Sequence, residues 1–390
     1  MRPLLTPDQP TDMPATCGQA MRPDRRRGLA LVLRTANGSS VKFTEIIGLA
    51  TLKPRTDFCR RVLVRESLMW NRGVAALVLS LLSLLMMSGM GMALYYSPVP
   101  GTAYDSVDYA QFKLPFGSVI RGIHYYAWNV LLMVMVMHLV RTLMVGAYRA
   151  QPKSAWVMGI GLGCLTSLCI ITGDLLPWDQ AGYWSTQVRL GIMASVPGVG
   201  DAAARFLKGG THVGIVTLTR FYVFHILFLP AFLLLGIGVY VGCLARIERT
   251  SSIGTRASAT NLLSPGWINF GLGLILLITL VLGAIAWQVP APFGDPADPT
   301  DTTYSPRPAW WVLWLNQLVT LLRGPWQVLG TAVIPGALLM GLAALPWIDG
   351  ASHHRVWQRT IQATMALIVL SVFWLSAMGY LDHHALPPAE

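Results

Sequence analysis

The chain has 390 residues, of which 54% are apolar and only 12% are charged. This composition excludes an ordinary soluble domain and indicates an integral membrane protein. The net charge of +11 would suit a nucleic-acid-binding protein, but the basic residues are distributed as membrane topology requires.

Seven stretches of about 20 residues or more contain no Asp, Glu, Lys or Arg. Each is long enough to cross the hydrocarbon core of a bilayer as a helix. In chain order they are residues 74–96, 122–140, 154–173, 221–245, 268–289, 324–348 and 360–381. The sequence therefore predicts an all-α integral membrane protein, with a bundle of four transmembrane helices followed by three more.

Two segments outside these spans divide the chain. Residues 1–28 contain no apolar core of signal-peptide length. Residues 1–64 are interpreted as a basic cytoplasmic arm. Residues 248–266 are polar and rich in Gly, Ser and Thr, which is typical of a linker. We therefore expect a four-helix domain over residues 65–247 and a three-helix domain over residues 267–390.

The basic residues are concentrated on one side of the predicted membrane. The first 72 residues hold 13 of the 29 Lys and Arg, and the loops after the second, fourth and sixth spans hold eight more. Since basic loops stay in the cytoplasm, we expect a cytoplasmic N-terminus, with 21 basic residues inside and 8 outside. The sequence predicts a multi-pass protein of the cell's inner membrane without a nucleic-acid partner.

The cysteines carry no metal signature. The five of them form no CxxC, CxxCH or zinc-binding pattern. The sequence therefore indicates neither a covalently attached c-type haem nor an iron–sulfur centre.

Three histidines lie inside the predicted spans. His124 and His138 are 14 residues apart in HYYAWNVLLMVMVMH, so on a helix they share nearly one face at opposite ends. His225 lies in the fourth span, within TRFYVFHILFLP. Neutral imidazole binds iron well, and two from facing helices give a six-coordinate centre, so a bis-histidine b-type haem is a candidate. The alternative is that these histidines only form hydrogen bonds between helices.

Glycines and arginines near these histidines suit the same cofactor. Gly159 and Gly173 repeat the 14-residue spacing, and Gly89 lies near the end of the first span. Glycine lets a flat macrocycle approach the backbone, although small residues also serve helix packing. Arg121 and Arg220 lie within about one turn of a histidine and would pair with haem propionates. The alternative for them is a simple place at the membrane boundary.

Longer motifs resemble a known family. The segment ITGDLLPWDQAGYW, with TLTRFYVFH and the paired histidines, resembles cytochrome b of the bc-type complexes, and most closely its counterpart in the cytochrome b/f complex. GDPADP and PAWWVLWLNQ resemble segments that open and line the quinol pocket in subunit IV of that complex. The resemblance covers residues 65–382 and implies a haem-binding four-helix domain fused to three helices of the subunit-IV type.

The resemblance also implies roles for single residues. His124 and His225 match the pair that ligates the haem on the outer side of the membrane. Arg121 and Arg220 match residues near its propionates. The positions that match small residues packed against the haems are Gly89, Gly159 and Gly173.

The same resemblance implies a substrate and partners. In bc-type complexes this haem accepts one electron from quinol, and the other passes to a Rieske iron–sulfur protein and on to a c-type cytochrome. A second haem returns the first electron to quinone on the inner side. We therefore expect quinol as substrate, and a Rieske protein, a c-type cytochrome, a second copy of the chain and membrane lipid as partners.

The inner haem lacks an expected ligand. In the family, the residue matched by His138 pairs with a fourth histidine, but the positions 14 and 15 residues after His225 are Val239 and Tyr240. Three alternatives stay open: a haem held by His138 alone, an unusual second ligand in Tyr240, or no haem, with His138 as a buried hydrogen-bonding residue. One haem b is expected, and a second is left open.

The quinol segment departs from the family as well. Relatives carry Pro-Glu-Trp-Tyr where this chain has Pro308, Ala309, Trp310 and Trp311. Alanine cannot accept the quinol proton that the glutamate is thought to take, and the candidate substitutes are Asp298, Asp301 and Tyr304. The residues expected at the quinol pocket are Pro308, Ala309, Trp310, Trp311 and Tyr183.

Two further sets of positions give no sign of a cofactor. The extra c-type haem of the b/f complex is attached through a cysteine near the start of the first span, and the matching position here is Gly73, so that haem is not expected. The remaining histidines are interpreted as solvated surface residues: His212, His353, His354, His383 and His384.

The leading functional hypothesis is a membrane cytochrome b subunit of a quinol–cytochrome c oxidoreductase, which oxidises quinol at its outer face. One alternative is a subunit with one haem that transfers electrons linearly, without bifurcation. The other is a membrane scaffold that keeps the fold without redox work of its own.

Overall fold

The computed structural model describes residues 32–34, 40–42, 57–250, 265–301, 303–349 and 355–385. The remainder of the expected arm, most of the expected linker, His353 and His354 lie outside the described residues. The chain divides into two compact units, residues 1–52 and residues 53–390. In the first unit, two short antiparallel strands pair, β1 (Val32–Arg34) and β2 (Ser40–Lys42).

The second unit is helical and contains the membrane spans. Within the described residues, seven helices are long and apolar enough to cross a membrane. The seven predicted spans and the all-α membrane fold are therefore confirmed. The first four run through α3 (Asp57–Ala93), α5 (Gly117–Val145), α6 (Lys153–Gly173) and a composite helix formed by α9 (Ile215–Val223), η2 (Phe224–Phe228) and α10 (Leu229–Thr250).

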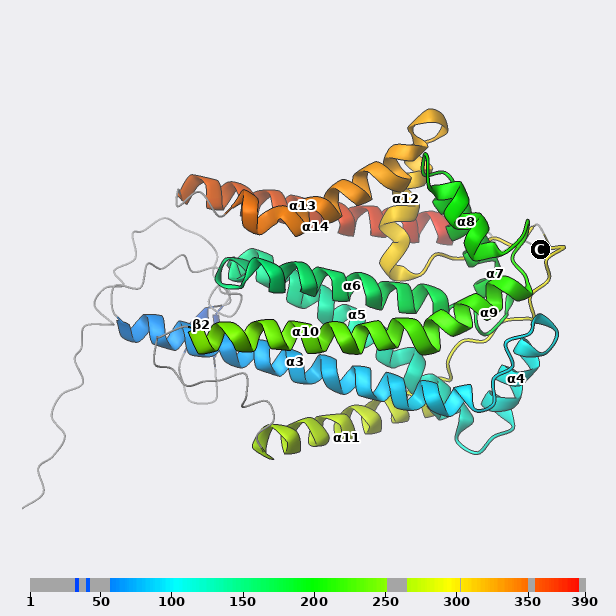
Figure 1. The fold of residues 1–390 in the computed structure, drawn as a ribbon, viewed down its shortest axis with the longest axis horizontal. Helices are drawn as coiled ribbons and strands as arrows, with labels where there is room; N and C mark the ends of the chain where they lie inside the picture. Colours follow the sequence, from blue (N-terminus) through cyan, green and yellow to red (C-terminus); the bar gives the residue numbers. More distant parts are fainter. Residues whose placement is uncertain are drawn as a thin grey trace, which may run out of the picture. The chain divides into compact units, whose positions relative to one another are not determined.

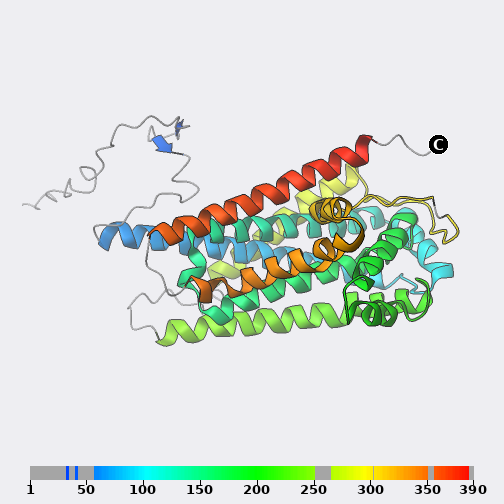
Figure 2. The same cartoon turned by 90° about the horizontal axis from the view of Figure 1, so that it is seen from above.

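The last three spans flank the four-helix bundle on two sides (Figures 1 and 2). Helix α11 (Pro265–Gln288) packs against α3 and α5. Helix α13 (Ile334–Ile348), preceded by the π-helical turn η6 (Leu329–Val333), packs against α6, and α14 (Arg355–Ala385) packs against α5. Residues of the C-terminal third thus reach both sides of the bundle.

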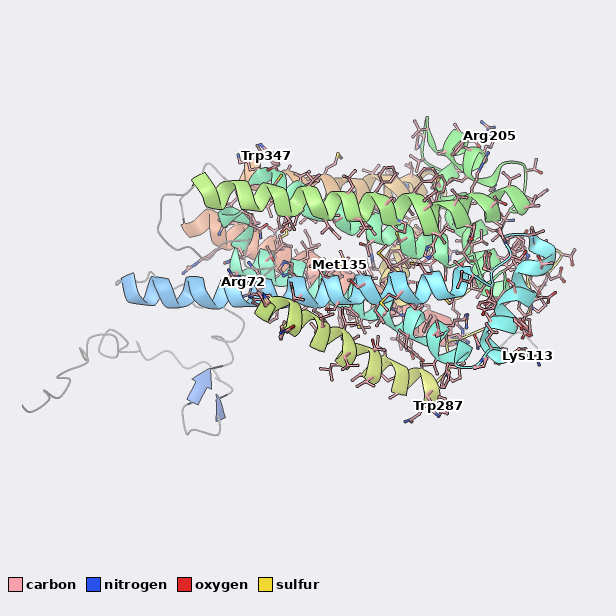
Figure 3. The ribbon with its side chains drawn as sticks, turned by 60° about the horizontal axis from the view of Figure 1, so that its bottom comes forward. Arg72, Lys113, Met135, Arg205, Trp287 and Trp347 are labelled. Carbon is pink, nitrogen blue, oxygen red and sulfur yellow. The ribbon has the colours of Figure 1, made fainter. Side chains whose placement is uncertain are left out.

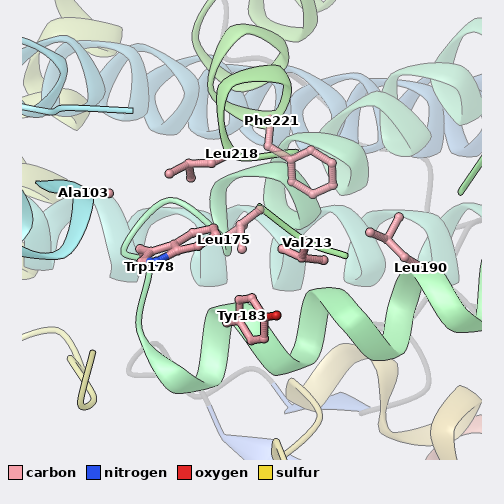
Figure 4. Close-up of a cluster of buried hydrophobic side chains, with 8 residues drawn as sticks. All are labelled: Ala103, Leu175, Trp178, Tyr183, Leu190, Val213, Leu218 and Phe221. Carbon is pink, nitrogen blue, oxygen red and sulfur yellow. The ribbon is translucent and has the colours of Figure 1, made fainter. Parts of the chain in front are cut away.

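At one end of the bundle, which is expected to face outward and is called the outer end, the loops fold into short helices (Figure 1). They are α4 (Pro100–Phe112), α7 (Gln180–Ala194), α8 (Gly200–Lys208), η4 (Trp310–Val312), α12 (Leu313–Leu321) and η5 (Gly324–Trp326). At the other end, η1 (Ala147–Ala150) connects α5 to α6. A cluster of buried apolar side chains joins α4, α7, α9 and the segments between them (Figure 4). This cluster gives the outer end a core of its own.

Few side chains of the spans are fully buried within the protein, as hydrocarbon solvent allows. Only 6–28% of each span's most apolar window is buried within the protein. Trp287 at the end of α11 and Trp347 at the end of α13 lie at opposite ends of the bundle (Figure 3) and are 70% and 52% exposed. Tryptophan at both ends is typical of the two membrane–water interfaces.

Candidate haem and quinol sites

The fourth span carries its histidine on a distorted turn. Pro230 has no N–H group and so cannot continue the regular helical hydrogen bonding. The preceding residues form the π-helical turn η2, in which the N–H of Leu229 donates to the carbonyl of Phe224. Such turns are frequent at functional sites. His225 lies in this turn.

His124 on α5 and His225 face each other across the bundle. Their ring centroids lie 6.2 Å apart, with an angle of 67° between the ring planes. This separation corresponds to two metal–nitrogen bonds of about 2 Å in addition to the radii of the two rings. The pair therefore suits one metal ion held between two imidazoles.

Both imidazoles are fixed through Nδ1. His124 Nδ1 lies 3.0 Å from Ser88 Oγ, whose hydroxyl donates to the carbonyl of Leu84 at 2.7 Å. His225 Nδ1 donates to the carbonyl of Cys169 at 2.9 Å. Since each Nδ1 therefore carries the proton, each Nε2 keeps a lone pair. A hydrogen bond of this kind at the second nitrogen is the usual support for a metal-binding histidine.

Two of the three predicted glycines back these imidazoles. A Cβ added to Gly89 would lie 3.2 Å from His124 Cε1, and one added to Gly173 would lie 2.5 Å from His225 Cε1. No heavy atom lies within 4 Å of the corresponding position at Gly159. The outer site is therefore closely backed by glycine, whereas Gly159 borders open space.

The two predicted propionate partners differ. Arg121 donates to the carbonyls of Ala291 and Pro292, at 3.0 and 2.7 Å, and also to the side chain of Gln111. In contrast, Nη1 of Arg220 is buried without a hydrogen-bond partner among the described residues. Arg220 therefore has a free donor for an anionic group, while Arg121 is engaged in anchoring a loop.

At the opposite end of the bundle, called the inner end, no described residue faces His138 as a second ligand. Its Nδ1 is buried without a hydrogen-bond partner in the described part of the chain. Val239 is 45% exposed, and no hydrogen bond among the described residues joins His138 to Tyr240. The structure thus brings His124 and His225 together but gives His138 no second imidazole.

The predicted quinol residues are held to α5. Trp310 Nε1 donates to Asn129 Oδ1 at 2.8 Å, and Asn129 Nδ2 donates to the carbonyl of Tyr125 at 2.8 Å. Pro308 and Ala309, just before η4, are partly buried. Trp311 Nε1 is buried without a partner among the described residues. The segment around Ala309 therefore lies against the helix that carries His124.

Tyr183 lies in the outer apolar cluster (Figure 4) and is 2% exposed. Its ring meets those of Trp178 and Trp184 edge-on, at centroid distances of 5.7 and 5.3 Å. Its hydroxyl accepts from Gln187 Nε2 at 3.3 Å. No described contact joins it to Trp310, so the structure does not bring all five predicted quinol residues together.

The three candidate replacements for the missing glutamate lie in the loop before η4. Asp298 accepts hydrogen bonds from Thr300, and Asp301 accepts from Gln180 Nε2 at 3.4 Å. Burial and nearby carboxylates raise the pKa of Tyr304, which keeps its phenol protonated. Both carboxylates are thus already engaged in local hydrogen bonds.

Sequence reasoning missed Asp179, which is 7% exposed. It accepts from the N–H groups of Gly182 at 2.8 Å and Gly294 at 3.3 Å, and so joins the start of α7 to the GDPADP segment. Burial raises the pKa of this carboxyl, although those two N–H groups and the charge of Arg121 act in the opposite direction. An acidic residue directly before the helix was the available signal, as an N-cap.

It also missed Ser88 and Asn129. Asn129 is the only amide within the predicted second span, and an amide at that depth is itself a sign of a required hydrogen bond. Ser88 carries no such signal, because small polar residues are common in membrane helices.

Comparison with known proteins identifies the family. Residues 129–296 match the family model described as "Cytochrome b(N-terminal)/b6/petB". The chain is 38% identical over 144 residues to cytochrome b6 of Cyanidium caldarium, covering 37% of this chain and 67% of the relative. With cytochrome b6 of Gloeobacter violaceus it is 38% identical over 143 residues, covering 37% and 66%. The chain thus spans about two thirds of the length of these relatives.

The fold agrees with this likeness. A solved structure described as "Hyperthermophilic respiratory Complex III" superposes with a TM-score of 0.63 at 23% identity, covering 81% of this chain and 84% of that one. The resemblance predicted from the sequence motifs is therefore confirmed. The chain, a multi-pass haem-binding membrane protein of a multi-subunit assembly, belongs to the cytochrome b family of the bc-type complexes.

Proposed function

We propose that this chain is a quinol-oxidising cytochrome b subunit that holds one haem b at its outer side between His124 and His225. The observation that carries the proposal is the 6.2 Å separation of the two ring centroids, with Nδ1 of each ring engaged elsewhere. Two facing imidazoles that each keep an Nε2 lone pair can hold a metal ion between them, and haem iron is a metal that takes two such ligands.

The surrounding residues orient the two imidazoles and offer a positive charge to a haem propionate. Ser88 and the Cys169 carbonyl hold the imidazoles in the tautomer that ligates iron. Arg220, with its free buried Nη1, offers a counter-charge for a propionate. When bound, haem b supplies a one-electron acceptor. Glycine at position 173 leaves room for the His225 ring, since a Cβ there would lie 2.5 Å from it.

We place quinol beside the segment Pro308, Ala309, Trp310 and Trp311, and leave Tyr183 out of the pocket because it is buried in the outer cluster. The hydrogen bond from Trp310 to Asn129 supports this placement, because it holds the segment against the haem-bearing helix. The free buried N–H of Trp311 is a donor suited to a quinol oxygen. Ala309 cannot accept a proton, so the proton must leave through other groups of the outer loops.

The proposal includes the setting of the protein. We place the N-terminus in the cytoplasm and the protein in the inner membrane, because of the distribution of the basic residues. The haem domain comprises residues 65–247, and the linker 248–266 leads to the three-helix domain 267–390. A Rieske iron–sulfur protein and a c-type cytochrome are the proposed acceptors, within a homodimeric complex.

A second candidate is linear electron transfer without bifurcation. It is favoured by two departures, Ala309 at the glutamate position and His138 without a facing histidine. Bifurcation sends the two electrons of one quinol to different acceptors. Rapid mixing of the complex and quinol with an oxidant distinguishes the two functions, because only bifurcation makes initially oxidised haem b become reduced by quinol when the oxidant is added.

The proposed haem is tested by His225→Ala in the purified complex. A pyridine haemochrome assay counts the haems, and electron paramagnetic resonance reports the low-spin signal of a bis-histidine centre. We expect His225→Ala to abolish that low-spin signal, and His212→Ala, at an exposed loop position, to leave it unchanged. An unchanged low-spin haem in His225→Ala would refute the assignment.

A further inference from the structure

The inner end of the bundle contains three buried nitrogen atoms without hydrogen-bond partners among the described residues. They are Trp70 Nε1 on α3, and His138 Nδ1 and Arg141 Nη1 on α5. The Arg141 guanidinium stacks on the Trp70 ring, 4.7 Å from its centroid, so two of these donors lie together. Buried donors are almost always satisfied in native proteins. The cluster therefore points to an absent acceptor.

The third helix leaves space at the same end. Gly159 lies 14 residues before Gly173 on α6, as His138 lies 14 residues after His124 on α5, so both are at the inner level. No heavy atom lies within 4 Å of a Cβ built at Gly159 or Gly161. At Gly163 the nearest atom is Cε of Met135, at 3.8 Å, and Figure 3 labels Met135 among the helices.

At Gly163 the neighbouring atom belongs to Met135 of α5. A Cβ at Gly236 on α10 would lie 2.9 Å from Leu162 Cδ2, so α6 and α10 pack tightly just beyond the glycines. The inner end therefore combines an imidazole, a guanidinium with an unpaired Nη1, and two glycines on one face of α6, Gly159 and Gly163, which are groups that suit a haem.

The side facing His138 offers no good second ligand. Valine at position 239 has no donor atom for a metal. Tyr240 would have to release its phenolic proton to ligate iron as a phenolate, and no described contact places a proton acceptor beside it. A haem bound here is thus ligated from one side.

We propose that the inner site binds one haem b through His138 alone, with the sixth coordination position of the iron open toward α10. Arg141 and Trp70 donate to one of its propionates. The inference rests on the proposed function and deepens it, because it assigns the second haem a different coordination from the first. An open position makes the iron high-spin and accessible to small neutral ligands such as carbon monoxide, which the six-coordinate outer haem excludes.

The experiment uses the purified complex without any quinol turnover. Haem is counted by pyridine haemochrome, spin states are read from the oxidised complex by electron paramagnetic resonance, and carbon monoxide is added to the reduced complex. We expect two haems per chain, one low-spin and one high-spin, and one carbon monoxide bound per chain. Two low-spin haems, or a single haem per chain, would overturn the inference.

Variants assign each signal to its site. We expect His138→Ala to lose the high-spin haem and carbon monoxide binding while the low-spin signal stays, and the double variant His124→Ala/His225→Ala to lose the low-spin signal alone. If the double variant loses the high-spin signal and keeps the low-spin signal, the outer assignment is contradicted. Retention of the high-spin signal in His138→Ala contradicts only the inner one.

Two further changes test the open position. Tyr240→Phe is expected to leave the spin state and carbon monoxide binding unchanged, whereas a changed spectrum would identify the phenol as a ligand and refute the open site. Placing a histidine opposite His138, as Val239→His or Tyr240→His, is expected to convert the high-spin signal to low-spin in one of the two variants and to abolish carbon monoxide binding there. Failure of both would contradict the geometry.

Discussion

His124 donates a hydrogen bond from Nδ1 to Ser88 Oγ across 3.0 Å, and the Ser88 hydroxyl in turn donates a hydrogen bond to the carbonyl of Leu84. This chain of two bonds fixes the tautomer of the imidazole from a neighbouring helix. As a consequence, the proposed outer iron ligand on α5 is oriented by a residue of α3.

Ser88→Ala is expected to weaken haem binding without abolishing it. Loss of such a supporting hydrogen bond costs about 10- to 100-fold in metal affinity. The measurement is haem release from the purified complex to an excess of apomyoglobin, followed by absorbance.

The matched control is Ser83→Ala on the same helix. Ser83 Oγ donates to the carbonyl of Leu79 and makes no described contact with a histidine. Equal haem release from both variants would show that loss of any serine hydroxyl on α3 has the same effect, and that His124 is not supported through Ser88.

Gly173→Ala is expected to displace His225. The added Cβ would lie 2.5 Å from Cε1 of the ring, which is too close for van der Waals contact, so the imidazole must move. Overpacking of this kind costs about 1–3 kcal/mol. We expect a shifted low-spin resonance signal or loss of the outer haem, measured as for His225→Ala.

Gly161→Ala provides the control, because it lies on the same helix with no heavy atom within 4 Å of the new Cβ. It should retain the outer haem with an unchanged low-spin signal. If both alanines leave the spectrum unchanged, contact with His225 is not the reason for glycine at position 173.

The spans could be predicted from the sequence because hydrocarbon imposes a simple rule, namely about 20 uncharged residues per crossing. The outer end could not be predicted in the same way. The predicted span 324–348 begins in structure as the short helix η5 and reaches its transmembrane helix only at residue 329. The bonds of Arg121 to the carbonyls of Ala291 and Pro292 join residues about 170 positions apart. Backbone carbonyls carry no sequence signal.

The candidate site likewise has features that the sequence predicts and features that only the packed structure reveals. His124 and His225 are visible from sequence because titratable residues are rare inside membrane spans. Their supports are the Ser88 hydroxyl and the Cys169 carbonyl, and these depend on which helices touch. The absence of a partner for His138 was visible by counting residues, whereas the nearby unpaired Arg141 and Trp70 required the packed structure.

The Asn129–Trp310 hydrogen bond predicts an effect on quinol binding. Its removal in Asn129→Ala releases the segment that contains Ala309, at a cost of about 1 kcal/mol, or about a five-fold higher KM for quinol. Steady-state quinol oxidation by the purified complex measures it. Trp310→Phe should have the same effect, and the double variant should be no worse than either single one, because both remove one bond.

Trp326→Phe is the control for this pair, since Trp326 is 65% exposed. It should leave KM unchanged. Additive effects of Asn129→Ala and Trp310→Phe would mean that the two residues act separately on the quinol pocket, which would contradict the proposed role of their hydrogen bond.

The ion pair of Arg149 with Asp349 predicts acid sensitivity at the inner end. Asp349 is 4% exposed and accepts hydrogen bonds from Arg149 and, at 2.6 Å, from the Tyr148 hydroxyl. Burial by itself would raise the pKa of this carboxyl, but the two hydrogen bonds and the charge of Arg149 hold it below its usual value. The pair joins the α5–α6 connection to the end of α13.

Because the folded pKa is depressed, the stabilisation is present above the unfolded pKa of about 3.9 and is lost as the pH falls through the folded pKa. Arg149→Ala leaves a nearly buried carboxylate with only Tyr148 as partner, and should cost about 1–3 kcal/mol at pH 7. Thermal unfolding of the purified protein between pH 7 and pH 3 measures both effects. The double variant Arg149→Met/Asp349→Asn removes both charges, and its unfolding temperature should fall less steeply with acid than that of the wild type. An identical pH dependence in the two proteins would mean that other carboxylates account for the acid sensitivity.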